Sequence, residues 1–334
     1  MNILVTGGAG YIGSHACKAL AAQGHTPVVY DNLSRGNRWA VKWGPLEEGD
    51  IADAERLREA LEKHRPAALM HFAAYAYVGE SVADPLMYYQ NNVAGTASLL
   101  RALLDYKTVP VVFSSTCATY GVPDHVPIGE DQPQRPINPY GYTKLVVEQM
   151  LRDLHMSHGL PWIALRYFNA AGADPDGEIG EAHDPEPHVI PLAIEAARSG
   201  GAFRVNGVDY DTPDGSCVRD FIHVADIADA HVRALEHLLK GGESRALNLA
   251  NAVGHSVKQV IAVTEQVCGR PIKVEVAPRR PGDPAVLVGD ASRARDLLGW
   301  RPSRSDLRTQ IEDAWNWARR REQVRSEPQE SSYH

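Results

Sequence analysis

A tyrosine and a lysine stand four residues apart in residues 138–144 (NPYGYTK). Proline is favoured at the first position of a helix, so Tyr140 and Lys144 are predicted to share one face of a helix that begins here. A lysine ammonium near a phenol stabilises the phenolate, which would let Tyr140 exchange a proton near neutral pH. This spacing is common by chance, so the chemistry depends on which other residues lie beside the pair.

Three hydroxyl residues end the run 111–116 (VVFSST), which is typical of a buried strand. Ser114, Ser115 and Thr116 could simply form a turn. In a doubly wound order, however, this strand directly precedes the Tyr140 helix, which places the hydroxyls beside the phenol. A hydroxyl that donates to a sugar oxygen, a tyrosine whose pKa the lysine lowers, and a nicotinamide that accepts hydride would together form one catalytic site.

The elements that would position these residues begin at the N-terminus. Residues 2–6 (NILVT) predict a buried parallel strand, and residues 7–13 (GGAGYIG) lead into a helix. Gly7 suits a tight turn, Gly10 a close approach to a pyrophosphate, and Gly13 close packing of helix and strand. The helix N-terminus would then bind the pyrophosphate of a dinucleotide.

A second predicted strand ends at Asp31, where a carboxylate can accept the ribose hydroxyls of NAD and repel the 2′-phosphate of NADP. Arg35 and Arg38 are the argument for NADP, since an arginine could receive that phosphate. Asp50 follows the third strand and could hold the adenine amino group, cap a helix, or do both.

Residues 67–74 predict a fourth strand with small residues at its carboxyl end, and a long helical segment follows from about Pro85 to Leu104. Asn91 in that segment could reach the cofactor or simply be an exposed polar residue. The alternation of strands and helices predicts an α/β fold, with a Rossmann-type doubly wound parallel sheet.

Composition limits the possible partners. The chain has 334 residues and a formal net charge of −8, which argues against nucleic acid or an anionic membrane as its main partner. It shows no apolar run of bilayer length and no secretory leader after Met1. Cys17, Cys117, Cys217 and Cys268 lie far apart, so neither a disulfide framework nor a metal site is indicated, and a reducing cytoplasm is expected.

Several stretches together resemble the extended short-chain dehydrogenases/reductases, and within them the UDP-glucose 4-epimerases. The likeness covers about residues 1–317. It is carried by residues 5–15 (VTGGAGYIGSH), 30–34 (YDNLS), 48–51 (EGDI), 71–74 (HFAA), 78–82 (VGESV), 88–93 (YYQNNV), 113–121 (FSSTCATYG), 138–144, 165–173 (LRYFNAAGA), 207–224 (GVDYDTPDGSCVRDFIHV), 248–251 (NLAN) and 279–283 (RRPGD).

The resemblance implies that Tyr140 takes the proton from the sugar O4 while the C4 hydride moves to NAD. Lys144 would bond the nicotinamide ribose and lower the pKa of Tyr140, and Thr116 would hydrogen-bond O4. The 4-keto sugar would turn over and take the hydride back on its other face. The cofactor contacts implied are Gly7, Gly10, Tyr11, Ile12, Gly13, Asp31, Asn32, Asp50, Ile51, Phe72, Ala73, Ala74, Asn91, Ser114, Ser115, Tyr140, Lys144 and Tyr167.

The second half would bind the sugar nucleotide. Arg219 and Arg280 would grip the diphosphate, since guanidinium groups suit phosphate oxygens. Asp283 would bond the uridine ribose. The other implied substrate contacts are Thr116, Tyr140, Asn169, His188 and Val205. His188 lies where the family often has asparagine, and it could equally be a solvated loop residue.

Departures from the family pattern leave alternatives open. Residues 117–120 (CATY) contain no carboxylate, which argues against a dehydratase. Ala76 replaces a lysine that often reaches the cofactor, and Leu287 leaves acceptance of N-acetylhexosamines open. Residues 76–81 (AYVGES) and 114–121 (SSTCATYG) are also similar to epimerases acting on UDP-xylose and UDP-arabinose, so a pentose or dual epimerase is the alternative. A non-catalytic NAD-binding regulator typically lacks the Tyr–Lys pair that this chain keeps.

The expected domains are an NAD-binding domain over residues 1–172, which takes back segments near 216–250, and a smaller α/β domain over 173–320 for the UDP-sugar. Residues 321–334 are expected to form a disordered polar tail. The resemblance implies a homodimer formed through the helices near Pro85–Leu104 and Lys144–His155.

Overall fold

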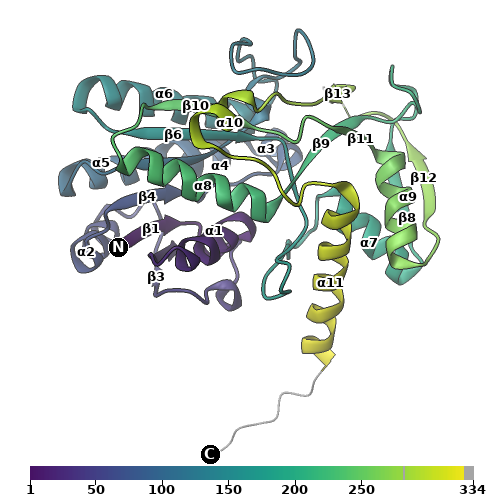
Figure 1. The fold of residues 1–334 in the computed structure, drawn as a ribbon, viewed down its shortest axis with the longest axis horizontal. Helices are drawn as coiled ribbons and strands as arrows, with labels where there is room; N and C mark the ends of the chain where they lie inside the picture. The colour runs from purple at the N-terminus through teal and green to yellow at the C-terminus, as the bar shows by residue number, and fades with distance from the viewer. Residues whose placement is uncertain (281–282, 327–334) are drawn as a thin grey trace, which may run out of the picture.

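A parallel sheet of seven strands organises the first half of the chain in the computed structural model, which describes residues 1–280 and 283–326 (Figure 1). Its strand order is β10-β6-β5-β4-β1-β2-β3, and every neighbouring pair is parallel. The strands are β1 (Asn2–Thr6), β2 (Thr26–Asp31), β3 (Leu46–Glu48), β4 (Ala68–His71), β5 (Val111–Thr116), β6 (Trp162–Tyr167) and β10 (Arg245–Leu249). The predicted Rossmann-type α/β fold is confirmed.

Helices cover both faces of this sheet because its strands are apolar on both sides. Ile3 and Val5 of β1 pack in one core cluster with α1 and α8, and Leu4 packs in another with α2, α5 and α6. These helices are α1 (Tyr11–Ala22), α2 (Ala54–His64), α5 (Thr96–Tyr106), α6 (Pro139–His158) and α8 (Val224–Leu239).

The helix predicted from Pro85 to Leu104 is one helical run with a change of pitch inside it. The short helix α3 (Val78–Ala83) precedes it, and the run consists of α4 (Pro85–Tyr88), a π-helical segment η2 (Tyr89–Gly95) and α5. Thr96 Oγ1 donates to the Asn92 carbonyl at 2.6 Å. A hydroxyl bonded to the carbonyl four residues back competes with the regular helical bond, which accounts for the wider turn.

The smaller layer lies beside the carboxyl ends of the sheet. The strand β9 (Val218–His223) pairs with β7 (Asn169–Ala171), β11 (Gly254–Ser256) and β13 (Val286–Leu287), while β8 (Ala202–Asn206) pairs with β12 (Lys273–Ala277). Packed with them are α7 (Val189–Ser199), α9 (Val257–Cys268) and α11 (Leu307–Ser326). The short α10 (Ser292–Leu298) packs near β10.

Residues 321–326 were expected to belong to a disordered tail, but they are helical. Helix α11 continues through Ser326, and residues 327–334 lie outside the described residues. Residues 319–323 (RRREQ) are good helix formers, so the helix extends past its apolar face.

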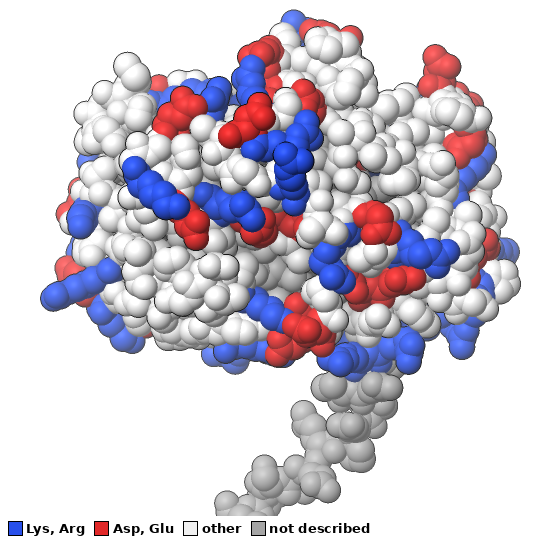
Figure 2. All heavy atoms as spheres, viewed as in Figure 1, with Lys and Arg blue, Asp and Glu red and all other residues white. Residues whose placement is uncertain are grey.

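The distribution of charged side chains and the polarity of the helices agree with what the composition predicts. Acidic and basic side chains are interspersed over the face shown in Figure 2. Of the helices within residues 1–280 and 283–326, none has both the length and the apolar character that a membrane span requires.

Candidate active site

The predicted helix start is confirmed, and it brings Tyr140 to the end of β5. Asn138 caps α6 by accepting from the Gly141 amide at 2.8 Å, and Pro139 is the first helical residue. Burial raises the pKa of the Tyr140 phenol to about 12, although Thr116 opposes this shift. Thr116 ends β5 and Tyr140 lies in the first turn of α6, which packs against β5, so both residues lie at the sheet edge where proton exchange is expected.

Lys144 lies one turn further along α6 and is 3% exposed. Its Nζ donates to the Ser114 carbonyl at 2.7 Å and lies 6.0 Å from the centre of the Tyr140 ring. Burial lowers the pKa of Lys144 to about 7, although Glu148 opposes this shift. The sequence predicted that Lys144 lowers the pKa of Tyr140, whereas in this structure burial dominates the pKa of both groups.

The two serines of β5 face different neighbours. The Ser114 hydroxyl contacts the Tyr167 hydroxyl at the end of β6. The Ser115 hydroxyl, expected beside the nicotinamide, instead donates to Glu148 Oε1 at 2.6 Å. Successive residues of a strand point to opposite faces, so only one of the two hydroxyls can face the site on the Tyr167 side.

Sequence reasoning missed a buried ion pair behind the catalytic strand. Glu148 is 0% exposed, and its two oxygens accept from Arg166 Nε at 2.8 Å and Nη2 at 2.6 Å. Tyr120 accepts from Arg166 Nη1 at 2.8 Å and donates to Asn248. The available signal was the position of Glu148, a charged residue one helical turn after Lys144.

The glycine loop after β1 fits a dinucleotide. A Cβ on Gly7 would lie 2.5 Å from the Ala73 amide nitrogen, and one on Gly13 would lie 2.2 Å from the Gly7 carbonyl, so only glycine allows these approaches. By contrast, a Cβ on Gly10 would meet only the Gly7 carbonyl oxygen within 4 Å, at 3.3 Å. No side chain caps α1, so its first amides remain available to an anion.

Asp31 lies at the carboxyl end of β2 beside this loop. Its two oxygens accept from the Ala9 amide at 3.0 Å and the Leu33 amide at 2.9 Å, and burial raises the pKa of the carboxyl group. Arg35 pairs with Glu80 at 2.6 Å and Arg38 pairs with Glu48. Both arginines are thus engaged elsewhere, which fits NAD better than NADP.

The remaining expected cofactor residues surround the same sheet edge. Asn32 donates to the Asp50 carboxylate at 2.8 Å, and the Phe72 amide bonds the Thr6 carbonyl at the end of β4. Asp50 does not cap α2, because Asp53 occupies that position. Asn91 donates to Asn92, and Asn92 in turn bonds both backbone groups of Tyr75. Ile51, Ala73 and Ala74 lie in the turns after β3 and β4.

Three expected substrate residues come together in the smaller layer. Arg219 of β9 pairs with Asp283 and also donates to the Val218 carbonyl at 2.8 Å. The Nε and Nη2 atoms of Arg280 each lie 3.2 Å from the side-chain oxygen of Asn206, when the Asn206 amide is turned so that its oxygen faces them. Burial raises the pKa of the Cys217 thiol, and the charges of Arg219, Asp283 and Arg280 all act on it.

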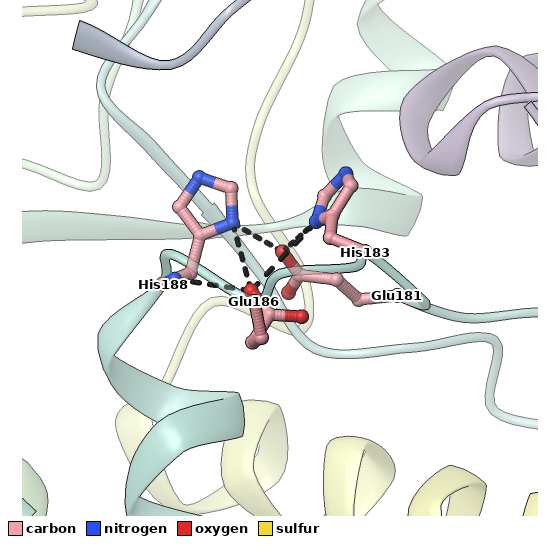
Figure 3. Close-up of side chains that lie close together, drawn as sticks. All are labelled: Glu181, His183, Glu186 and His188. Atoms are coloured by element: carbon pink, nitrogen blue, oxygen red, sulfur yellow. Dashed lines mark hydrogen bonds and ion pairs between the residues drawn. The ribbon is translucent and has the colours of Figure 1, made fainter. Parts of the chain in front are cut away.

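The other expected substrate residues have different surroundings. Asn169 lies in β7 and donates to the Asp220 carbonyl at 3.2 Å. Val205 is buried in β8. His188, expected near the substrate phosphates, is the residue before α7 and contacts Glu181 and Glu186 through its Nδ1 (Figure 3). The place of His188 in the substrate site stays a prediction.

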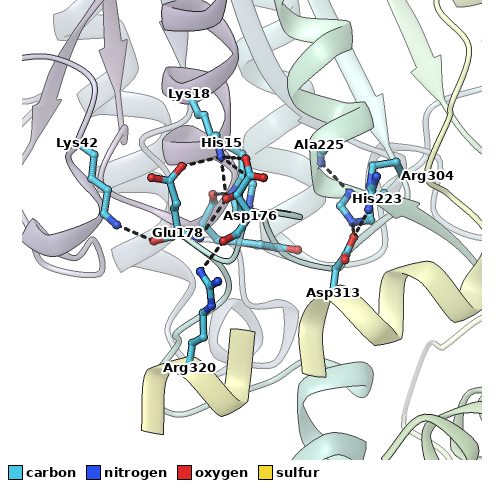
Figure 4. A network of polar contacts seen from close by, with 12 residues as sticks. His15, Lys18, Lys42, Asp176, Glu178, His223, Ala225, Arg304, Asp313 and Arg320 are labelled. Carbon is cyan, nitrogen blue, oxygen red and sulfur yellow. Dashed lines mark hydrogen bonds and ion pairs between the residues drawn. The ribbon is translucent and has the colours of Figure 1, made fainter. Parts of the chain in front are cut away.

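Two buried polar residues hold loops next to α8. His223 accepts from the Ala225 amide at 3.0 Å at the start of α8 and contacts Asp313 of α11 (Figure 4). Asp226 accepts from the Ser303 and Arg304 amides, each at 2.9 Å. The end of β9 and the start of α8 are therefore held to α11 and to the segment that leads into it.

Comparisons with known proteins agree with this site. Residues 3–250 match the family described as NAD dependent epimerase/dehydratase. The chain is 57% identical over 325 residues to a UDP-glucose 4-epimerase of Rhizobium meliloti (strain 1021), covering 96% of this chain and 98% of that one.

Solved structures show the same similarity. The UDP-glucose 4-epimerase from Brucella ovis in complex with NAD is 54% identical with a TM-score of 0.92, over 94% of this chain and 97% of that chain. The enzyme from Bifidobacterium longum in complex with NAD+ and UDP is 35% identical with a TM-score of 0.91, over 96% and 98%. The expected resemblance is confirmed, and the chain belongs to the NAD dependent epimerase/dehydratase family.

Proposed function

We propose that this protein interconverts UDP-galactose and UDP-glucose by transient oxidation at the sugar C4, with NAD as its cofactor. The observation that carries the proposal is the position of Tyr140 and Lys144 one turn apart on α6, with Lys144 Nζ bonded to the Ser114 carbonyl of β5 at 2.7 Å. In the sheet order, β4 and β1 lie next to β5, and the glycine loop follows β1. The proton-exchanging residues and the dinucleotide cradle therefore share one edge of the sheet.

NAD, when bound, would supply the acceptor and donor for the hydride exchanged at C4. Tyr140 takes the proton from O4 and later gives it back, and Thr116 bonds O4 during this exchange. Lys144 orients the cofactor ribose. Arg219 and Arg280 hold the diphosphate while the 4-keto sugar turns over. Since no net oxidation occurs, NAD stays on the protein through every cycle.

The experiment that tests this function is incubation of the purified protein with UDP-galactose, without added cofactor, followed by chromatography of the products. UDP-xylose is run beside it, and the Tyr140→Phe variant is the control. Formation of UDP-glucose that is lost in the variant supports the proposal. Conversion of UDP-xylose alone would move the assignment to a pentose epimerase, and no product from either sugar, with NAD added, would overturn it.

We also propose that the enzyme acts as a homodimer in the cytoplasm. The helical run 85–106 and α6 contact each other on the outside of the sheet and carry exposed apolar side chains, including Leu86 and Met156. A reducing location fits the four cysteines, which are free thiols.

A further inference from the structure

Four side chains converge in the segment that connects β7 to α7. Glu181, His183, Glu186 and His188 each offer one ligand atom, and these four atoms all lie within 4.8 Å of one another (Figure 3). They come from only eight residues of chain, so one loop conformation creates the whole cluster. Neither the proposed catalytic residues nor the cofactor contacts include it.

The distances within the cluster suit a common central ion. The Nδ1 atom of His183 lies 2.9 Å from Glu181 Oε1 and 3.7 Å from Glu186 Oε1. The Nδ1 atom of His188 contacts the same Glu181 oxygen and lies 3.4 Å from the same Glu186 oxygen. A tetrahedral zinc ion with bonds of about 2.0–2.2 Å separates its ligand atoms by roughly 3.3–3.6 Å. Small movements would therefore place all four atoms on one ion.

Without an ion, each Nδ1 atom must carry a proton that it donates to a glutamate oxygen, which either the neutral Nδ1–H tautomer or the imidazolium can supply. Hydrogen bonds from the two Nδ1 atoms to Glu181 are therefore the competing arrangement. In it the two imidazole rings lie with their centres 5.3 Å apart. A single divalent cation would instead be bound by both Nδ1 atoms and would neutralise both carboxylates.

A second acidic group in the same segment shows the contrast. Asp174, Asp176 and Glu178 also lie close together, but Lys18 of α1 contacts them at 2.8, 2.8 and 2.7 Å (Figure 4). Their cation is therefore already a side chain of the protein. The cluster around Glu181 has histidines in place of that lysine, and histidine nitrogen with carboxylate oxygen is a donor set that zinc accepts.

We propose that Glu181, His183, Glu186 and His188 bind one divalent transition-metal ion, with Zn²⁺ as the best fit to this donor set. The cysteines gave no indication of a metal in the sequence, and this site uses none of them.

The role of the ion is structural. The His183 ring lies edge-on to Tyr11 and Tyr77, with ring centres 6.3 and 5.6 Å apart. Tyr11 begins α1 in the glycine loop, and His183 lines one small cavity together with Gly10, Tyr11 and Arg35. The Glu181 carbonyl also accepts from the Trp317 indole of α11 at 2.8 Å. The metal would therefore fix the connecting segment against the dinucleotide loop.

The test measures metal directly, on untagged full-length protein, so it does not depend on the proposed epimerase activity. Protein treated with a chelator is desalted, incubated with Zn²⁺ and analysed by mass spectrometry for bound metal, and its affinity is measured by competition with a chromophoric chelator. We expect about one Zn²⁺ per chain. Removing two ligands in His183→Gln/His188→Gln should weaken binding at least about 100-fold, since even outer partners of a metal site contribute 10–100-fold.

Two matched variants control for the loss of two imidazoles and of two nearby carboxylates. His155→Gln/His158→Gln, at the end of α6, and Asp176→Asn/Glu178→Gln, in the same segment, should both bind Zn²⁺ like the unmodified protein. If the double histidine variant fails to fold, Glu186→Gln loaded with Co²⁺ should show a changed visible spectrum. Equal Zn²⁺ affinity in the unmodified protein and the histidine variant would overturn the proposal and leave the hydrogen bonds between the two histidines and the glutamates.

Discussion

Tyr140 and Lys144 are both shifted toward their neutral forms, because both lie in a desolvated site. Burial raises the pKa of Tyr140 to about 12 and lowers that of Lys144 to about 7. With a raised pKa, the Tyr140 phenol keeps its proton until a base removes it, and the neutral Lys144 amine adds no charge that would favour the phenolate. Thr116 lowers the pKa of the phenol, so it opposes the effect of burial and favours removal of the proton.

Replacing Tyr140 by phenylalanine should lower kcat for UDP-galactose by about 10²–10⁴-fold, because a positioned acid–base group contributes that much. The phenylalanine ring keeps the packing against Tyr88, whose ring centre lies 6.5 Å away, so the fold should not change, and any loss of NAD would report the contact of the hydroxyl with the cofactor. Steady-state kinetics and the absorbance of the released cofactor measure the two effects. A loss of less than tenfold in kcat would mean that another group handles the O4 proton.

Lys144 predicts how stability depends on pH. Its native pKa of about 7 lies below the ordinary value of 10.5, so between these values the unfolded chain binds one more proton than the native chain. Its contribution to the free energy of unfolding should therefore rise by about 1.4 kcal/mol per pH unit across that window, and be lost as pH falls toward 7.

Urea unfolding of the unmodified protein and of Lys144→Met at pH 7.5, 8.5 and 9.5 tests this dependence. The difference between the two free energies should grow with pH in favour of the unmodified protein. Since both proteins share every other titrating group, a difference that does not change with pH would show that Lys144 stays charged in the native state.

At the scale of elements, the ion pair of Glu148 and Arg166 ties α6 to β6 behind the catalytic strand. Both side chains are buried, at 0% and 3% exposure, and two hydrogen bonds join them. Glu148→Gln should lower the free energy of unfolding by about 3–5 kcal/mol, because it leaves the guanidinium buried without its counter-charge. Urea titration measures the change.

Two further variants test whether the lost counter-charge causes this destabilisation. Arg152 also contacts Glu148, but its side chain is 36% exposed, so Arg152→Gln should cost less than about 1 kcal/mol. The double variant Glu148→Leu/Arg166→Met should recover much of the stability lost by Glu148→Gln, since no charge remains buried. A double variant as unstable as the single one would point to packing rather than to charge.

The start of α6 could be predicted from the sequence because Asn138 and Pro139 act on their own helix. The partners of Glu148 could not, because Arg166 is 18 residues away and Ser115 33 residues away, and nothing local fixes which buried groups meet. The same holds for Arg219 and Asp283, which were predicted for one site but not as a pair. Asp50 shows that even a local signal can be ambiguous. Asp50 and Asp53 lie three residues apart and both suit a helix cap, but only Asp53 caps α2.

For the whole molecule, the parallel sheet is completed from the second half of the chain. The pairing of β10 with β6 and the packing of α8 beside α1 bring residues 224–249 back onto the first layer. A motif-rich first half and a specific resemblance predicted this architecture. The His–Glu cluster of residues 181–188 escaped prediction because its residues do not recur at the period of a helix or a strand, and only the loop conformation gathers them.

The proposed dimer gives a prediction at this largest scale. The side chains of Val82 and Leu86 are 63% and 70% exposed, and those of Tyr142 and Met156 on α6 are 47% and 84% exposed. Exposed apolar side chains of this size on adjacent helices are typical of an interface. In a two-fold dimer each residue occurs twice, so Leu86→Glu would bring two carboxylates into one desolvated surface.

We therefore expect the unmodified protein to sediment at twice the mass of one chain and Leu86→Glu to shift toward the monomer at micromolar concentration. Val253 in the smaller layer is 49% exposed, and Val253→Glu is the matched control that should stay dimeric. An unmodified protein that sediments as a monomer would contradict the dimer. A dimer that persists in Leu86→Glu would place the contact on another face, because a buried pair of like charges would otherwise separate the chains.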